Sequence, residues 1–134
     1  MTAELAWLTA TMVLAASLWI PYVVGVNMHL SAEVDPFQRP HANQGLPDWV
    51  LRANRAHINL IEQGVPFAAL LLTAHLAAVS TPVTVAAAVA FFWLRLAHAA
   101  GMIAGWARMP LRPILFTAGW LCAIAVAVEI FRTA

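Results

Sequence analysis

The stretch from Arg52 to Phe67 reads RANRAHINLIEQGVPF, and it places ionisable side chains at the start of a long apolar segment. It contains two arginines, a histidine, two asparagines and a glutamate. A charge inside a lipid bilayer costs at least about 2.5–3.5 kcal/mol, so such residues usually face a cavity, a pathway or a partner. The stretch therefore predicts a polar surface inside an otherwise apolar protein.

The composition of the whole chain is that of a membrane protein. The chain has 134 residues, which suits one domain, and it is 63% hydrophobic and only 10% charged. A soluble domain has about 25% charged residues. The net charge of +1 gives no indication of a nucleic-acid partner, and we expect none. We therefore predict a single integral membrane domain over residues 1–134.

Four segments are long enough to cross the hydrocarbon layer, which takes about 20 residues of helix. They cover about residues 3–29, 48–79, 82–106 and 112–132. Only helices and closed barrels can span a bilayer, and no segment alternates with the period of two that a barrel strand requires. The sequence therefore predicts an all-α bundle of four transmembrane helices.

Prolines mark where these helices start, bend and stop. Pro21 is expected to kink the first helix, and Pro82 suits the first turn of the third. Pro36 and Pro40 argue against a helix in the first connection. Asp48 is expected to be the N-cap residue of the second helix.

The arginines predict the orientation in the membrane. Arg39, Arg52 and Arg55 lie in or beside the first connection, and Arg108 and Arg112 lie in or beside the third. Because positive residues collect on the cytoplasmic side, both connections are expected in the cytoplasm and both termini outside it.

Five residues of the opening stretch recur at steps of three and four. They are Arg52, Arg55, Asn59, Glu62 and Pro66. On a helix that advances about 100° per residue, they fall within one arc of about 80°. His57 lies off this arc. The five residues therefore form one stripe that runs from the predicted cytoplasmic end of the helix into the membrane.

A second stripe is predicted in the third segment. Arg95, His98, Met102 and Gly105 follow the same steps and descend from the same side. Arginine-rich stripes suggest an anionic ligand, because the planar guanidinium group matches a carboxylate in bidentate fashion. Glu62 would suit an ammonium group. We therefore expect a small ligand with carboxylates and an amine that enters from the cytoplasm.

A purely structural interpretation stays open for each residue. Arg52 could extend its charge to the interface, and Glu62 could pair with Arg55 or Arg95 to hold helices together. His75 and His98 could be ordinary contacts between helices. The sequence predicts no metal site, because even His57 and His75, which share a helix face, lie about 27 Å apart along the helix axis.

Several motifs resemble one family. Its signature is matched here by Arg55, Ala56, His57, Asn59, Glu62 and Pro66. LWIPYVV in the first segment resembles a bacterial branch, FWLRLAHAAGM the third-helix motif, and LRPILFTAG the start of the fourth helix. The chain thus resembles the MAPEG superfamily, the membrane-associated proteins in eicosanoid and glutathione metabolism, and within it the microsomal glutathione transferases. The likeness spans nearly the whole chain.

The resemblance implies a homotrimer of four-helix subunits that binds glutathione, as co-substrate, at subunit interfaces near the cytoplasmic side. The implied glutathione-binding residues are Arg52, Arg55, His57, Asn59, Glu62, Arg95 and His98. Arg112 best matches the arginine that stabilises the glutathione thiolate. The resemblance further implies lipophilic electrophiles as second substrates, contact with membrane lipid, and a place in a bacterial inner membrane.

Three hypotheses stay open, and the first two differ over a departure from the family pattern. Catalytic members often have a tyrosine at the position of Met102, and a thioether cannot donate a hydrogen bond. The first hypothesis is a glutathione transferase or peroxidase with a role in detoxification. The second is a glutathione-binding relative with little catalysis, because Met102 replaces the tyrosine. The third is a small proton-coupled exporter of four helices.

Overall fold

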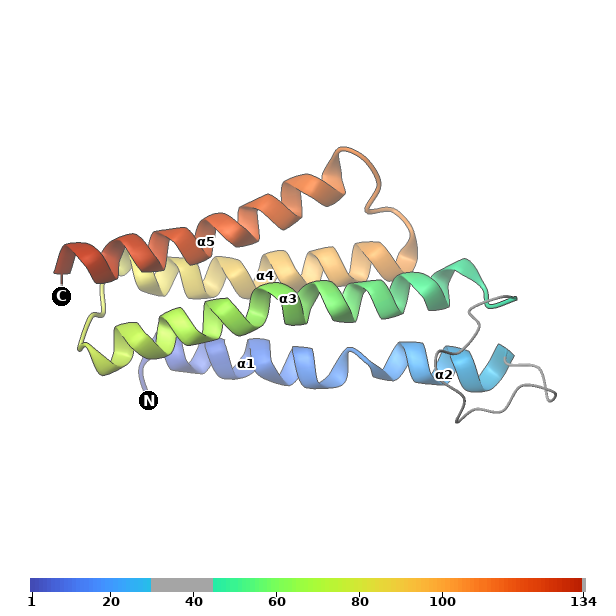
Figure 1. The fold of residues 1–134 in the computed structure, drawn as a ribbon, viewed down its shortest axis with the longest axis horizontal. Coiled ribbons are helices and arrows are strands. Elements are labelled where there is room, and N and C mark those ends of the chain that lie inside the picture. The colour runs from blue at the N-terminus through green and yellow to red at the C-terminus, as the bar shows by residue number, and fades with distance from the viewer. Residues whose placement is uncertain (30–44, 134) are drawn as a thin grey trace.

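The computed structural model describes residues 1–29 and 45–133, and within them it contains helices and no strand (Figure 1). The helices are α1 (Ala3–Ser17), α2 (Ile20–His29), α3 (Asp48–Leu76), α4 (Pro82–Ala104) and α5 (Leu111–Thr133). The predictions that concern Pro36, Arg39 and Pro40 lie outside the described residues. The predicted all-α fold is confirmed.

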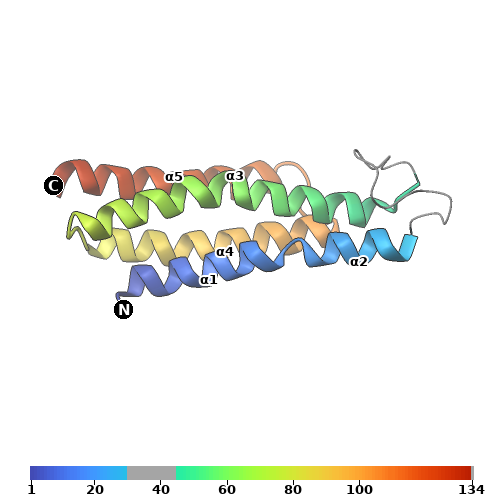
Figure 2. The same ribbon diagram turned by 60° about the horizontal axis from the view of Figure 1, so that its bottom comes forward.

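The first predicted segment is divided into two helices. α1 ends at Ser17, and α2 begins at Ile20. In a continuous helix the ring of Pro21 would collide with the carbonyl group of the residue four positions earlier, which is Ser17. The expected kink is therefore present as a short break, and α1 and α2 lie end to end along the bundle (Figures 1 and 2).

α3 contains the polar stripe and is the longest helix among the described residues. Its N-cap residue is Pro47, so Asp48 is the first helical residue and the predicted cap lay one position too late. Pro66 lies inside the helix. Since proline has no backbone N–H, the carbonyl group of Glu62 loses its usual helical partner. α3 thus lacks one backbone hydrogen bond beside Glu62, a residue of the polar stripe.

α4 has well-defined caps at both ends. Thr81 and Thr84 form a capping box, and Pro82 occupies the first turn, as predicted. The helix ends at Gly105, whose φ of 86° lies in the left-handed region that glycine adopts without strain. This corner sets the direction of the connection to α5.

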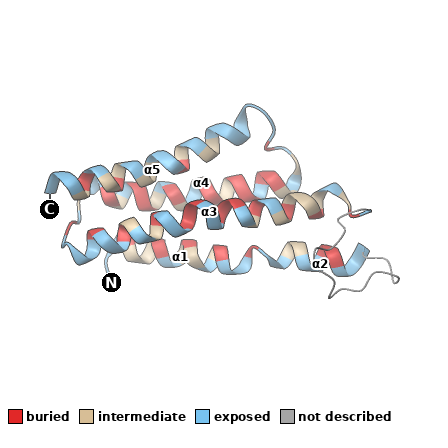
Figure 3. Cartoon of the chain, in the orientation of Figure 1, coloured by how far each residue is buried: buried red, intermediate tan, exposed pale blue. Residues whose placement is uncertain are grey.

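The helices run side by side, with both chain termini at one end of the bundle and the start of α3 at the other (Figures 1 and 2). α4 packs against α1, α3 and α5. The rings of Phe67 and Phe91 stack with 3.9 Å between centroids and join α3 to α4. Buried residues are concentrated on α3 and α4, whereas most of α5 is exposed (Figure 3).

A buried carboxylate fixes the end of the bundle that holds the termini. Glu4 accepts hydrogen bonds from the hydroxyls of Ser80, at 2.6 Å, and Thr84, at 3.0 Å. Glu4 lies in the first turn of α1, while Ser80 and Thr84 lie at the turn into α4. These bonds hold α1 against the α3–α4 turn.

Within the described residues, three helical segments are long and apolar enough to cross a membrane. The first consists of α1 and α2 together, the second is α4, and the third is α5. α3 has a suitable length, but its ionisable residues lower its hydropathy. Large apolar side chains such as Val65, Trp120 and Leu121 are exposed on α3 and α5. A surface of this kind suits lipid or a neighbouring subunit rather than water.

Candidate functional site

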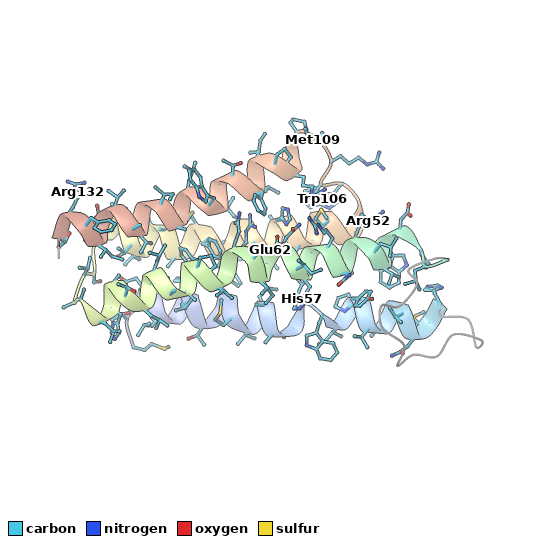
Figure 4. The ribbon with its side chains drawn as sticks, viewed as in Figure 1. Arg52, His57, Glu62, Trp106, Met109 and Arg132 are labelled. Atoms are coloured by element: carbon cyan, nitrogen blue, oxygen red, sulfur yellow. The ribbon has the colours of Figure 1, made fainter. Side chains whose placement is uncertain are left out.

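A pocket of about 330 Å³ lies between α3 and the start of α5. Its lining residues are Arg55, Asn59, Glu62, Met109, Arg112, Pro113, Phe116 and Thr117. Figure 4 shows Glu62 on α3 and Met109 in the connection before α5, which form opposite walls. Three members of the predicted α3 stripe thus meet the predicted catalytic arginine, Arg112, in one cavity.

The charged groups of the pocket are not paired with one another. Glu62 forms no ion pair with Arg55 or Arg95 among the described residues, where the ion pair that occurs joins Arg132 to Glu129 at the far end of α5. Asn59 is 3% exposed, and its Nδ2 atom has no hydrogen-bond acceptor among the residues that the structure describes. Two guanidinium groups, one carboxylate and one amide are therefore available to a ligand.

Arg95 lies behind the pocket rather than on its wall. It is only 1% exposed, and its Nη2 donates a hydrogen bond to the carbonyl oxygen of Leu115 at 2.6 Å. Its Cζ lies 5.7 Å from the ring centre of Phe91 and 5.6 Å from that of Phe116. Its Nε and Nη1 have no partner in the described part of the chain. Arg95 is thus a buried cation that forms no ion pair with a carboxylate of residues 1–29 and 45–133.

Gln63 is a second buried polar contact to α5, and the sequence analysis missed it. Its Nε2 donates to the carbonyl oxygen of Phe116 at 3.0 Å. Gly119 leaves room for both contacts, because a Cβ atom there would lie 2.7 Å from Gln63 Oε1 and 2.8 Å from Arg95 Nη2. The available signal was an amide one helical turn after Asn59 in an apolar segment.

Arg52 lies on the same stripe as Arg55 but points to a different place. Its Nε donates to the carbonyl oxygen of Met102 at 2.9 Å, and its Nη2 donates to that of Ile103 at 3.4 Å. The last carbonyl groups of a helix have no helical donors, so Arg52 caps α4. It does not line the pocket. Arg52 therefore connects the start of α3 to the corner at Gly105.

The other predicted residues lie inside the bundle. His98 is 2% exposed, and its Nε2 has no hydrogen-bond partner in the described part of the chain. His57 is partly buried, and neither histidine lines the pocket. The side chain of Met102 packs in an apolar cluster with Leu18 and Leu60, away from the pocket. Within residues 1–29 and 45–133, no group of histidine, cysteine and acidic side chains could hold a metal ion.

A second, apolar cavity of about 390 Å³ adjoins the polar pocket, and it is an open hollow on the surface of α5, the helix that holds all of its lining residues. It is lined by Pro113, Ile114, Thr117, Ala118 and Leu121, so the two cavities share Pro113 and Thr117. A polar ligand and an apolar one could thus lie next to each other.

The fold and the site together define an all-α integral membrane protein with a polar pocket between two of its helices. The model of the MAPEG family matches residues 5–132, and the chain belongs to this family. It is therefore a membrane protein of glutathione-related or eicosanoid metabolism in the general sense of that family. No match was found among curated proteins or among solved structures.

Proposed function

We propose that the pocket between α3 and α5 binds glutathione and that the protein is a glutathione transferase or peroxidase acting on lipophilic electrophiles. The observation that carries the proposal is the unpaired charge set of the pocket, Arg55 and Arg112 with Glu62. Glutathione has two carboxylates and one ammonium group, so its charges are opposite to those of the two arginines and the glutamate. A volume of about 330 Å³ lies at the lower end of the usual range for small-molecule sites, roughly 300–1,000 Å³.

Each lining residue has a role in this proposal. Arg55 binds a glutathione carboxylate, Glu62 binds the ammonium group, and Asn59 bonds to the peptide. Arg112 stabilises the thiolate. Lowering the pKa of a thiol from about 8.5 to about 6.5 requires roughly 2.7 kcal/mol, and one hydrogen bond to a charged group supplies about 1.5–3 kcal/mol. Arg112 could thus provide most of the stabilisation.

The buried residues behind the pocket support glutathione binding through their electric field and by positioning the residues that line the pocket. Arg95 places a fixed positive charge next to Phe116, where the low dielectric screens it weakly. His98 lies three residues later on α4, and its ring centroid is 6.3 Å from that of Phe116. Arg52 and His57 are assigned supporting rather than ligand-contacting roles.

The apolar cavity along α5 would receive the lipophilic electrophile from the bilayer. In the transferase reaction, the thiolate sulfur bonds to the electrophilic carbon, and the leaving group departs with the bonding electrons. In the peroxidase reaction, the sulfur takes the terminal peroxide oxygen and an alcohol leaves. A second glutathione then forms the disulfide and releases water.

Assembly and location follow from the same proposal. The homotrimer would bring exposed apolar residues of α3, such as Ile58, Ile61 and Val65, against other subunits. Both connections that contain arginines would lie in the cytoplasm, with both termini outside, in a bacterial inner membrane. The pocket, at the end away from the termini, would then open to cytoplasmic glutathione.

Arg112→Ala tests the catalytic role. We expect conjugation of glutathione to a lipophilic electrophile in liposomes to fall about 10- to 100-fold, which corresponds to the loss of roughly 1.5–3 kcal/mol. Arg108→Ala is the matched control, because Arg108 lies in the same connection but does not line the pocket. Equal activity of the two variants would contradict the assignment.

The binding protein with little catalysis is the second candidate. A large gain in conjugation by Met102→Tyr would support it. The position of Met102, buried away from the pocket, favours the transferase instead, and we expect no gain. Membership of the MAPEG family favours both over the exporter, which a proton-driven efflux assay in vesicles would detect.

A further inference from the structure

The hydroxyl group of Thr117 differs from those of three other helical threonines. Thr9, Thr11 and Thr73 each donate a hydrogen bond to the carbonyl oxygen of the residue four positions earlier, at 2.7, 2.9 and 2.9 Å. Such a bond satisfies a hydroxyl in an apolar environment. Thr117 forms no side-chain hydrogen bond within the described ranges, although its α5 backbone is equally helical. Its donor is thus available to a ligand.

Thr117 lies at the boundary between the polar pocket and the apolar cavity, because it lines both. A reaction that joins a polar thiol to an apolar electrophile must take place at such a boundary. The other residue that lines both cavities is Pro113, which has no donor group. Of the two residues that line both cavities, Thr117 is therefore the one that can donate a hydrogen bond.

The pocket has no other source of a hydroxyl among its described lining residues. Met102, at the position where catalytic relatives have a tyrosine, is buried between α1 and α3. A hydroxyl group on α5 can donate a hydrogen bond to the sulfur even though the residue at position 102 has no hydroxyl group.

We infer that Thr117 is a further catalytic residue, whose hydroxyl donates a hydrogen bond to the thiolate of bound glutathione beside Arg112. This inference rests on the proposed function. The thiol proton passes to water, Thr117 keeps its own proton, and the sulfur lone pair then forms the bond to the electrophilic carbon while the leaving group departs with its bonding electrons. The hydroxyl stabilises the thiolate before attack.

The test is a pH titration of bound glutathione, followed by the ultraviolet absorbance of the thiolate, in Thr117→Val and Thr117→Ser. Valine matches threonine in shape but lacks the hydroxyl, so we expect the midpoint to rise by about one pH unit, equivalent to about 1.4 kcal/mol. Serine keeps the hydroxyl and should titrate near the wild-type midpoint. Thr73→Val, which removes a hydroxyl from α3 far from the pocket, should leave the midpoint unchanged.

An unchanged midpoint in Thr117→Val, with glutathione bound as tightly as by the wild type, would overturn the inference while leaving the proposed function intact. Wild-type protein that binds no glutathione would instead overturn both. If Thr117→Val does not fold, Thr117→Ala gives the same readout, with helix content by circular dichroism as the folding control.

Discussion

Gly119, on the buried side of α5, occupies a position that no larger residue can fill without displacing a polar group. A Cβ atom there would lie 2.7 Å from Gln63 Oε1 and 2.8 Å from Arg95 Nη2. Both side chains bond to α5 carbonyl groups, so neither can move without leaving a buried donor unsatisfied. The absence of one methyl group thus allows α3 and α4 to hold α5 beside the pocket.

We expect Gly119→Ala to destabilise the protein by about 1–3 kcal/mol, as overpacking of a core does. Gly64→Ala is the matched control, because its Cβ would meet nothing closer than 3.5 Å and alanine favours a helix by about 0.5–1 kcal/mol. Thermal unfolding in detergent measures both. A Gly119→Ala variant as stable as Gly64→Ala would show that the contacts of Gln63 and Arg95 do not hold α5.

At the scale of the helices, the corner between α4 and α5 determines where Arg112 lies. Arg52 caps the last turn of α4, and the chain then turns through Gly105, whose Cβ position would lie 3.1 Å from Arg52 Nη2. The N–H group of Ala107 bonds back to the carbonyl oxygen of Gly101 at 3.0 Å. This folded corner delivers Met109 and Arg112 to the pocket.

Arg52→Ala should therefore weaken glutathione binding through the corner rather than through a lost ligand contact. We expect it to lower the affinity for glutathione and for the glutathione monoester with a blocked glycine carboxylate by the same factor, measured by calorimetry. Arg52→Lys, which can still bond one carbonyl group, should be intermediate. A loss confined to glutathione itself would show that Arg52 contacts that carboxylate directly.

Across the whole molecule, the length of the apolar segments predicted the helices, and the spacing of polar residues predicted which of them share a helix face. It could not predict which neighbour each face meets. Arg52 and Arg55 are three residues apart on one stripe, yet Arg52 contacts α4 and Arg55 lines the pocket. In the second stripe, Arg95 and His98 contact residues of α5, whereas Met102 packs with Leu18 and Leu60. The roles of Gln63 and Thr117 were not predicted, because a single polar residue in an apolar helix forms no repeating pattern.

The central claim is that the α3–α5 pocket is a glutathione site, and calorimetry of glutathione binding to the purified protein in detergent tests it most directly. We predict binding by the wild type and its loss in Arg55→Ala, while Arg132→Ala, at the far end of α5, should bind normally. If Arg55→Ala binds glutathione as tightly as the wild type, glutathione binds outside the α3–α5 pocket. Absence of binding by a folded wild-type protein at millimolar glutathione would contradict the account.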